Sequence, residues 1–443
     1  MGSGSTRREV RRVAAATLLG LLLTTAAATP AVSAETIRQE QWYLDRMQAE
    51  GMWKTSTGTG VTVAVIDTGV DPANPDLVGR VLPGKDYATD QSGDEHTDYD
   101  GHGTGMAGII AATGANGGGR GSFGLAPGAK ILPIRLPKSG VAANLAEGEK
   151  VFNEALAPAI RYAADHDARV INISQAVQGD TPEVVDAVKY ALKKGSLIFA
   201  GVGNDAQKGN LPMHPAATPG VVGVAAVGKD LHRTDFSQYG PQVDMAAPGE
   251  DMVHACGGKT GLCTTTGTSD ATALASASAA LIWSAHPTWT NNQILRVMLN
   301  TIGGPTDGAK RNDAIGYGIV RPRIALQNPG DPGPADVYPL PDLAEAANSA
   351  SPTPSAKASE PAKAAATPKN DNSTTPWLGI GLGTAALAAA ALATTAVVRK
   401  RRTATTPQQQ PHPATTPQGF GPPPTMPGHI PPPPNQHHHP EAP

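Results

Sequence analysis

The sequence predicts an α/β domain with an open, mostly parallel β-sheet covered by helices on both faces. Between residues 61 and 326, short runs of Val, Ile, Leu and Ala alternate with longer segments of helical periodicity. The apolar runs are nearly continuous, as in parallel strands that are buried on both faces. Strands that alternate with helices form right-handed βαβ units, so we expect the strands to join one sheet.

Five strands and three helices can be placed within this region. The predicted strands are Val61–Ile66, Lys130–Leu136, Arg169–Ile173, Leu197–Val202 and Val221–Val227. One helix is expected over Ala146–Asp165. A second should begin at the Thr-Pro-Glu sequence of residues 181–183, which combines a capping hydroxyl, a first-turn proline and an early acid, and should end at Lys194 before Gly195. A third, Ala-rich helix is expected over Ala271–Trp283.

Composition limits the folded region and the classes of partner. The chain has 443 residues, but Pro, Ala, Ser and Thr dominate after about residue 328, so only the part before that point is expected to build a core. The formal net charge is −3, and no long run of one sign occurs. The charge therefore gives no reason to expect nucleic acid as a partner.

The N-terminus predicts an export signal over residues 1–34. Four arginines between residues 7 and 12 precede an apolar stretch from Val13 to Leu23, and Ala-Val-Ser-Ala ends at Ala34 as a cleavage site would. The Arg7-Arg8 pair leaves the twin-arginine route open beside the general secretory route. Residues 35–60 then form an N-terminal extension of the folded domain.

The C-terminal part predicts a membrane anchor. Residues 328–376 lack periodicity and are expected to form an extended, disordered linker. Residues 377–398 carry no charge and would be about 33 Å long as a helix. Four basic residues follow directly, which favours a single span with its C-terminal end in the cytoplasm. A soluble Ala-rich helix is the alternative. The basic, then Pro-rich, tail of residues 399–443 is expected to be disordered and cytoplasmic.

The chain has two cysteines, Cys256 and Cys263. In an exported protein two nearby cysteines are expected to pair, and the Gly-rich loop between them can close. Such a bridge would stabilise the fold by roughly 2.5 kcal/mol and would stiffen the segment before the third helix. Two free thiols are the alternative.

Three short motifs carry an acid, a base and a nucleophile, in that order. Asp67 ends a predicted strand in Val-Ile-Asp-Thr-Gly, His102 lies in Gly-His-Gly-Thr, and Ser269 follows Gly-Thr at the start of the Ala-rich helix. A buried Asp can orient a histidine that takes the proton of a serine hydroxyl. A helix N-terminus offers free N–H groups to an oxyanion, and the side-chain amide of Asn204 is the expected second donor.

The Asp…His…Ser order and the surrounding sequences resemble the subtilase family. The resemblance covers about residues 60–327 and includes Phe236–Gly240, Val243–Gly249 and Gly316–Val320, the last of which resembles the family's closing strand. It implies a subtilisin-like three-layer αβα domain over residues 61–327 and hydrolysis of peptide bonds in an extended cleft. The S1 side of that cleft would be formed by Ser174, Gln175, Ala176, Gly201 and Gly203.

The whole arrangement is similar to that of mycosins, the membrane-anchored subtilases associated with type VII secretion. This similarity implies a protein or peptide substrate, a location on the outer face of the cell membrane, and a type VII secretion membrane complex as partner. Residues 35–60 are too few for an inhibitory prodomain. In mycosins the corresponding segment wraps the domain, and here Trp42, Tyr43 and Trp53 would anchor it.

The sequence departs from the family pattern at three positions. Ala273 stands where proline is expected, Gln175 replaces a leucine, and Asp270 directly follows the nucleophile. A carboxylate at position 270 would either raise the pKa of His102 or deter acidic substrates. These departures leave open a catalytically weak or silent subtilase that serves as a structural component of a secretion complex. A general, freely secreted protease is disfavoured by the predicted span.

No cofactor is expected. Structural calcium stays open, because many subtilases bind it and because Asp94, Glu95, Asp98 and Asp100 form an acidic loop. Their spacing matches no calcium-binding motif. We therefore expect a solvated loop and no metal ligand set.

Overall fold

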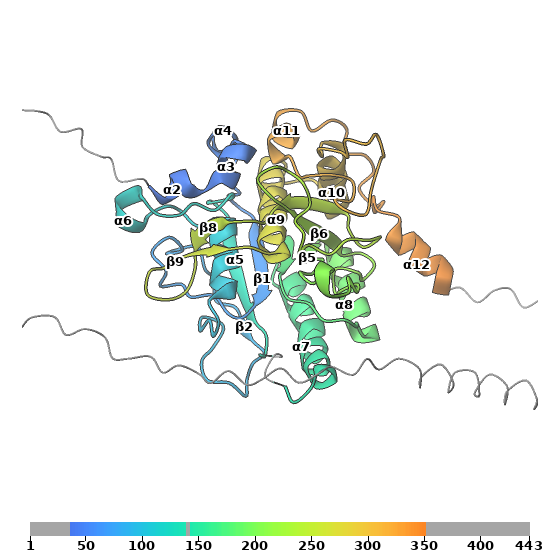
Figure 1. Ribbon diagram of the computed structural model, residues 1–443, viewed down its shortest axis with the longest axis horizontal. Coiled ribbons are helices and arrows are strands. Elements are labelled where there is room, and N and C mark those ends of the chain that lie inside the picture. The colour runs from blue at the N-terminus through green and yellow to red at the C-terminus, as the bar shows by residue number, and fades with distance from the viewer. Residues whose placement is uncertain (1–35, 139–141, 351–443) are drawn as a thin grey trace, which may run out of the picture. The chain divides into compact units, whose positions relative to one another are not determined.

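The computed structural model describes residues 36–138 and 142–350 (Figure 1). The predicted signal peptide, the membrane span, the cytoplasmic tail and the second part of the linker lie outside the described residues. Within the described segments, no helix is both long enough and apolar enough to cross a membrane.

The centre of the fold is a parallel sheet of seven strands in the order β2-β3-β1-β4-β5-β6-β7. The strands are β1 (Thr62–Asp67), β2 (Lys85–Asp86), β3 (Lys130–Arg135), β4 (Val170–Ile173), β5 (Leu197–Gly201), β6 (Val222–Val227) and β7 (Met245–Pro248). A separate antiparallel hairpin consists of β8 (Met252–Ala255) and β9 (Leu262–Thr265). The prediction of a parallel α/β sheet is confirmed, and each of the five predicted strands forms within one residue of its expected bounds.

Helices cover the sheet and complete the domain. They are α2 (Ile37–Glu40), α3 (Trp42–Met47), α4 (Ala49–Trp53), α5 (His102–Ala111), α6 (Asn116–Gly119), α7 (Leu145–Asp165), α8 (Pro182–Lys194), α9 (Thr268–Ala285), α10 (Asn291–Asn300), α11 (Pro322–Gln327) and α12 (Asp342–Ala350), with a short 3-10 helix η2 (Ala206–Lys208). Helix α5 packs against α9, and α7 packs against α8.

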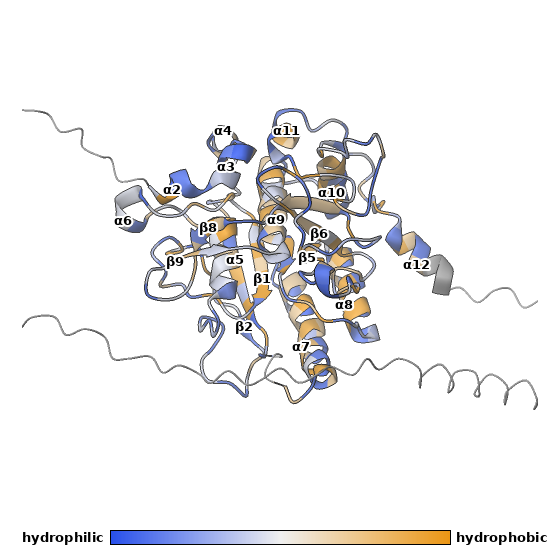
Figure 2. Cartoon of the chain, in the orientation of Figure 1, coloured by the Kyte–Doolittle hydropathy of each residue, from blue (hydrophilic) through white to orange (hydrophobic). Residues whose placement is uncertain are grey.

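Successive side chains of β1 belong to two hydrophobic cores, one on each face of the sheet. Val63 and Val65 join the core that contains apolar residues of α5 and α9. Ala64 and Ile66 join the core that contains apolar residues of α7 and α8. Figure 2 shows β1 in the hydrophobic colour between these helices. Because both faces of the strand are covered, its sequence is continuously apolar and shows no alternation.

The predicted helices form, and their ends follow from local chemistry. The Thr181 hydroxyl accepts a hydrogen bond from the Val184 N–H at the start of α8. The helix stops at Gly195, which has a φ of 94°, in a left-handed conformation that glycine adopts at little cost. Helix α9 begins at Thr268, three residues before the predicted start. Ser269 therefore lies in its first turn.

The N-terminal extension lies against the domain and is anchored by the three expected aromatic residues. The Trp42 indole N–H donates to the Glu250 carbonyl oxygen over 3.0 Å. Tyr43 is fully buried and its hydroxyl donates to a β8 carbonyl oxygen over 2.8 Å. The Trp53 indole N–H donates to the Leu125 carbonyl oxygen. The extension thus wraps the domain, as expected from the resemblance.

The region after residue 327 differs from expectation. Instead of an extended linker from Asn328, the chain stays on the domain and forms α12. The Arg296 guanidinium donates to the carbonyl oxygens of Pro332 and Pro334, and the Gly220 N–H donates to the Asp342 carboxylate. These polar contacts hold a segment that has too few apolar residues to form a core of its own. The predicted closing strand, residues 316–320, forms only isolated bridges, which join it to β7, to Gly303 and to Asn312.

Candidate active site

Asp67 and His102 meet at the edge of the sheet where the parallel strands end. Asp67 is the last residue of β1, and His102 is the first residue of α5. The Asp67 Oδ1 and His102 Nδ1 atoms are 2.7 Å apart, within hydrogen-bonding distance. Gly101, which precedes the helix, has a φ of 86°, so the chain makes the tight turn that brings the histidine back over the strand.

The Asp67 carboxylate is fully buried and is held mainly through one oxygen. Its Oδ1 also accepts hydrogen bonds from the Thr68 N–H at 2.8 Å and from the Gln175 side-chain amide at 3.4 Å. Its Oδ2 has no hydrogen-bond partner among the described residues. Gln175, one of the departures from the family pattern, therefore contacts the acid directly.

The environment of His102 favours its protonated form. Burial lowers the pKa of His102, but the carboxylates of Asp67, Asp270 and Asp100 outweigh it and raise the pKa from 6.5 to about 9. The side chain keeps 31 % of its surface exposed, so water screens part of this field. The hydrogen bond to Asp67 accounts for Nδ1 as a donor, which leaves Nε2 as an acceptor in the neutral ring.

Ser269 lies in the first turn of α9 and contacts the end of β4. Its hydroxyl donates to the Ser174 carbonyl oxygen over 3.0 Å, and the Ser174 hydroxyl donates to the Ser269 carbonyl oxygen over 3.2 Å. Within the described part of the chain, the Ser269 hydroxyl makes no hydrogen bond to His102. Buried polar groups fix this junction, because the Asn172 amide donates to the Ser174 hydroxyl and the Ser276 hydroxyl donates to Asn172 Oδ1, each over 3.0 Å.

Asn204 lies beside the first turn of α9. Its Oδ1 accepts a hydrogen bond from the Thr268 N–H at 2.9 Å. This contact fixes the orientation of the amide, and its Nδ2 makes no hydrogen bond to any described residue. The Ser269 N–H belongs to the first turn of α9, where backbone donors have no partner within the helix. Two free donors are thus available next to the Ser269 hydroxyl.

The remaining predicted substrate-binding residues follow the ends of two neighbouring strands. Gly201 ends β5, and a Cβ atom there would lie 2.9 Å from the Thr268 hydroxyl. Gly203 has a φ of 107° and its N–H donates to the same hydroxyl over 3.3 Å. Ser174, Gln175 and Ala176 follow β4, which pairs with β5. The structure therefore brings both predicted segments to the same edge of the sheet as Asp67.

The acidic loop before α5 makes hydrogen bonds to neighbouring parts of the protein. The Asp98 carboxylate accepts hydrogen bonds from the hydroxyls of Thr68 and Thr104, at 2.7 Å and 2.6 Å, and from the backbone N–H of Gly101. It thereby ties the turn before His102 to the end of β1. Among the described residues, no three His, Cys, Asp or Glu side chains gather in a way that could hold a metal ion.

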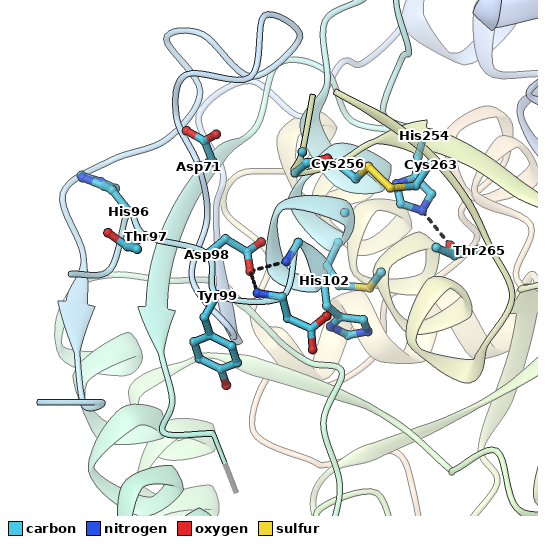
Figure 3. A pocket seen from close by; sticks show the side chains of 16 residues that line it. Asp71, His96, Thr97, Asp98, Tyr99, His102, His254, Cys256, Cys263 and Thr265 are labelled. Carbon is cyan, nitrogen blue, oxygen red and sulfur yellow. Dashed lines mark hydrogen bonds between the residues drawn. A yellow bond between two sulfur atoms is a disulfide. The ribbon is translucent and has the colours of Figure 1, made fainter. Parts of the chain in front are cut away.

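A cavity of about 730 Å³ lies between this loop and the β8–β9 hairpin (Figure 3). His102 lines it from the side of α5, and His254 and Thr265 line it from the hairpin. Cys256 and Cys263 form the predicted disulfide across the hairpin. The expected pairing is confirmed, and the bridge stiffens the wall opposite the acidic loop.

Several residues that shape the site were not predicted from the sequence. Asn172 interrupts an otherwise apolar strand, and a polar residue at a buried strand position is a signal that it makes specific hydrogen bonds. Arg135 is fully buried at the end of β3, and its guanidinium donates to both carboxylate oxygens of Asp86 at 2.9 Å. Ser276 gives no such signal, because it lies in a helix rich in Ala and Ser.

The expected effect of Asp270 on acidic substrates is not supported. Asp270 is only 1 % exposed and its Oδ1 accepts a hydrogen bond from the Thr265 hydroxyl at 2.8 Å. A side chain this deeply buried has no surface to present to a substrate. Its charge does act on His102, whose pKa it raises.

Comparisons with known proteins agree with this architecture. The model of the Subtilase family matches residues 58–318. The chain is 35% identical to an intracellular serine protease of Paenibacillus polymyxa over 262 residues, 56% of this chain and 76% of that protein. It is 33% identical to Mycosin-1 of Mycobacterium tuberculosis over 330 residues, which cover 64% of this chain and 72% of that protein.

The solved structures include one titled as the serine protease MycP1, an essential component of the type VII (ESX-1) secretion system. It superimposes with a TM-score of 0.57 at 31% identity and covers 67% of this chain and 90% of that one. The family match alone extends over more than half of the 443 residues. The chain therefore belongs to the subtilase family of subtilisin-type serine proteases and is related to the mycosins.

Proposed function

We propose that this protein is a membrane-anchored serine endopeptidase that cleaves peptide bonds through an acyl-enzyme on Ser269. The observation that carries the proposal is the 2.7 Å contact between Asp67 and His102 at the same sheet edge as Ser269 and Asn204. The acid fixes the ring so that Nε2 is free to accept a proton. The remaining groups supply a nucleophile and two donors for an oxyanion.

The first chemical step begins with a rotation of the Ser269 side chain. Its hydroxyl leaves the Ser174 carbonyl oxygen and donates to His102 Nε2. The oxygen then attacks the carbonyl carbon of the substrate while its proton passes to Nε2. The carbonyl oxygen gains the negative charge, and the Asn204 amide and the Ser269 N–H donate hydrogen bonds to it.

The second part of the reaction reverses the proton transfer. The protonated His102 gives its proton to the leaving amine, so that the peptide bond breaks and the acyl group stays on Ser269. Water enters, gives a proton to His102 Nε2 and attacks the ester carbonyl carbon. Return of that proton to Ser269 releases the carboxylate product and regenerates the enzyme.

Features of the sequence support a location on the extracytoplasmic face of the cell membrane. The charge-free segment of residues 377–398, followed by four basic residues, would anchor the chain with its catalytic domain outside. The similarity to Mycosin-1 and to a protein titled as a component of a type VII secretion system supports a protein of such a system as substrate and its membrane complex as partner.

A structural role in a secretion complex is the second candidate function. One observation favours it, because the Ser269 hydroxyl is hydrogen-bonded to Ser174 and not to His102. If that arrangement persisted when substrate is bound, the base would not reach the nucleophile. The protein would then contribute only its folded domain to an assembly.

Labelling of the full-length protein with a membrane-impermeant fluorophosphonate tests the proposal. We expect labelling in right-side-out membrane vesicles, and its loss in a Ser269→Ala variant. A chain that ends before Trp377 should be labelled equally well but should leave the membrane fraction. Absence of labelling in both vesicles and detergent would overturn the enzymatic proposal. Labelling only after the vesicles are opened would overturn the proposed location.

A further inference from the structure

A buried chain of three polar side chains lies beside the site and has no part in the mechanism described above. The Asp270 carboxylate on α9 accepts from the Thr265 hydroxyl at 2.8 Å, and that hydroxyl is 2.7 Å from Nε2 of His254 on β8. Asp270 and His254 are each only 1 % exposed. Figure 3 shows His254 and Thr265 in the wall of the cavity that His102 also lines.

The hydrogen bonds that join Asp270, Thr265 and His254 cannot all form unless Asp270 or His254 carries an additional proton. His254 Nδ1 lies 2.8 Å from the Ala255 carbonyl oxygen, which can only accept, so Nδ1 carries a hydrogen. In the neutral ring, Nε2 must then accept the single Thr265 hydroxyl proton. The Thr265 oxygen can accept in turn from Asp270 only if Asp270 is protonated. When Asp270 is ionised, the carboxylate and Nε2 of a neutral His254 compete for one hydroxyl proton.

The cluster is packed directly against the elements that carry His102 and Ser269. Asp270 follows Ser269 in the first turn of α9. A Cβ atom at Gly105 of α5 would lie 2.8 Å from His254 Cε1, so the histidine ring rests on the helix that begins with His102. Because α5 packs against both α9 and the hairpin, the charge on Asp270 acts on His102 across packed protein, and water screens only the exposed side of the ring.

Electrostatics agree with this coupling. Burial raises the pKa of Asp270 to about 7 and lowers the pKa of His254 to about 4. Below about pH 7 the additional proton therefore resides on Asp270, and above that pH the carboxylate is ionised while His254 stays neutral. The other titratable groups that face these residues are Asp67 and Asp100 around His102, and the phenol of Tyr43 near Asp270. Protonated His102 and ionised Asp270 stabilise each other: the carboxylate raises the pKa of His102, and the imidazolium lowers that of Asp270.

We propose, on the basis of the proposed peptidase function, that Asp270 is a positioning residue of the catalytic base. Its carboxylate, held by Thr265, stabilises the imidazolium of His102. His254 competes with Asp270 for the Thr265 hydroxyl. The imidazolium forms in each proton transfer of the reaction, so a second buried carboxylate lowers the barrier to those steps. Asp67 orients the ring, whereas Asp270 acts through charge alone.

The test is the pH dependence of fluorophosphonate labelling of the full-length protein. In Asp270→Asn, which keeps the shape but removes the charge, the pH of half-maximal labelling should fall by roughly one unit. Thr265→Val should give the same downward shift, because the buried carboxylate loses its donor and stays neutral. Thr265→Ser retains the hydroxyl and should restore the wild-type profile. The double variant Asp270→Asn, Thr265→Val should shift no further than Asp270→Asn alone.

A merely structural role gives a different result. Loosened packing would lower the maximal rate of labelling in Asp270→Asn and Thr265→Val without moving the pH of half-maximal labelling, and that outcome would overturn the proposal. Ser278→Ala serves as the control for loss of a buried hydroxyl on α9, because this hydroxyl only donates to its own helix.

If the wild-type protein itself is not labelled, the proposed peptidase function fails, and the role of Asp270 as a positioning residue fails with it. If the wild type is labelled and the profiles coincide, only the role of Asp270 fails.

Discussion

Ser269 and Ser174 exchange two hydrogen bonds, one from each hydroxyl to the other's backbone carbonyl oxygen, over 3.0 Å and 3.2 Å. This pair joins the first turn of α9 to the end of β4, the strand next to the one that ends in Asp67. The Ser269 oxygen therefore lies on the sheet side of the site. The proposed mechanism requires a rotation of this side chain that brings the oxygen to His102, while the hydrogen bond from the Ser174 hydroxyl holds the backbone of α9.

The buried network below this pair should contribute to stability. Replacement of Ser276 by Ala would leave Asn172 Oδ1 without its donor in the core, at a cost of about 1–3 kcal/mol in the free energy of unfolding. Ser278→Ala is the matched control, because its carbonyl partner, that of Leu274, can still be satisfied by the helix. Chemical denaturation of the two variants measures the difference. Equal stabilities would contradict the assigned network.

Asn204 should matter for rate and little for stability. Its replacement by Ala removes the side-chain donor to the oxyanion, and we expect the rate of phosphonylation to fall about 10²- to 10³-fold. Asn204 itself is exposed, so water can replace its Oδ1 at the Thr268 N–H once the side chain is removed, and the unfolding transition should hardly move. Gln207→Ala, a nearby exposed change, is the control. A loss below tenfold would mean that Asn204 does not face the reacting carbonyl.

The pH profile should reflect the raised pKa of His102. The ring acts as a base only when it is neutral, so labelling should rise with pH and reach half of its maximum near pH 9. The same shift makes folding pH-dependent. Because the pKa in the folded state lies above 6.5, this contribution to stability is complete below pH 6.5 and is lost as the pH rises through about 9.

Substitution of Asp67 by Asn provides the check on this assignment. It removes the largest source of the upward shift, so the pH of half-maximal labelling should fall toward 6.5 while the maximal rate falls strongly. Both quantities are read from the same set of labelling rates. A profile that keeps its midpoint in Asp67→Asn would show that another group controls the acidic limb.

The N-terminal extension should stabilise the domain and should not inhibit it. The Tyr43 hydroxyl donates to the Val253 carbonyl oxygen and accepts from the Gln41 amide at 2.7 Å, all in the interior. Tyr43→Phe removes one of two donors to that carbonyl, since the Gln41 amide also donates to it over 3.1 Å, and should cost about 0.5–1.5 kcal/mol without raising the rate of labelling. Tyr239→Phe, at an exposed phenol, is the control. A faster rate in Tyr43→Phe would instead indicate an inhibitory segment.

The sequence predicted the parts of the fold whose local chemistry and tertiary setting agree. The interior of β1 and all of β5 are continuously apolar because helices cover both faces of these strands, and α8 carries its own start and stop signals at Thr181 and Gly195. The motifs around Asp67, His102 and Ser269 are likewise local. Asp67 consequently ends its strand and Ser269 lies at the start of the Ala-rich helix, as the motifs predict.

The parts that could not be predicted depend on contacts between distant segments. Strand β2 has two residues, and the buried Arg135 guanidinium holds it through Asp86. The sequence after Asn328 predicts a linker, because it has no periodic apolar pattern and because contacts between its backbone carbonyl groups and Arg296 leave no signal in the sequence. The burial of Asp270 depends on Thr265 of the hairpin, and its position beside Ser269 in the sequence does not reveal this.

The central claim is that Ser269, activated by His102, forms a covalent bond with a carbonyl-like electrophile. The most direct measurement is mass spectrometry of the full-length protein after reaction with a peptidyl phosphonate, with the modified residue located by peptide mapping. We predict one adduct, on Ser269, in the wild-type protein, and almost none in His102→Ala, which keeps the nucleophile but lacks the base. An adduct on another residue, or equal modification of His102→Ala, would contradict the account.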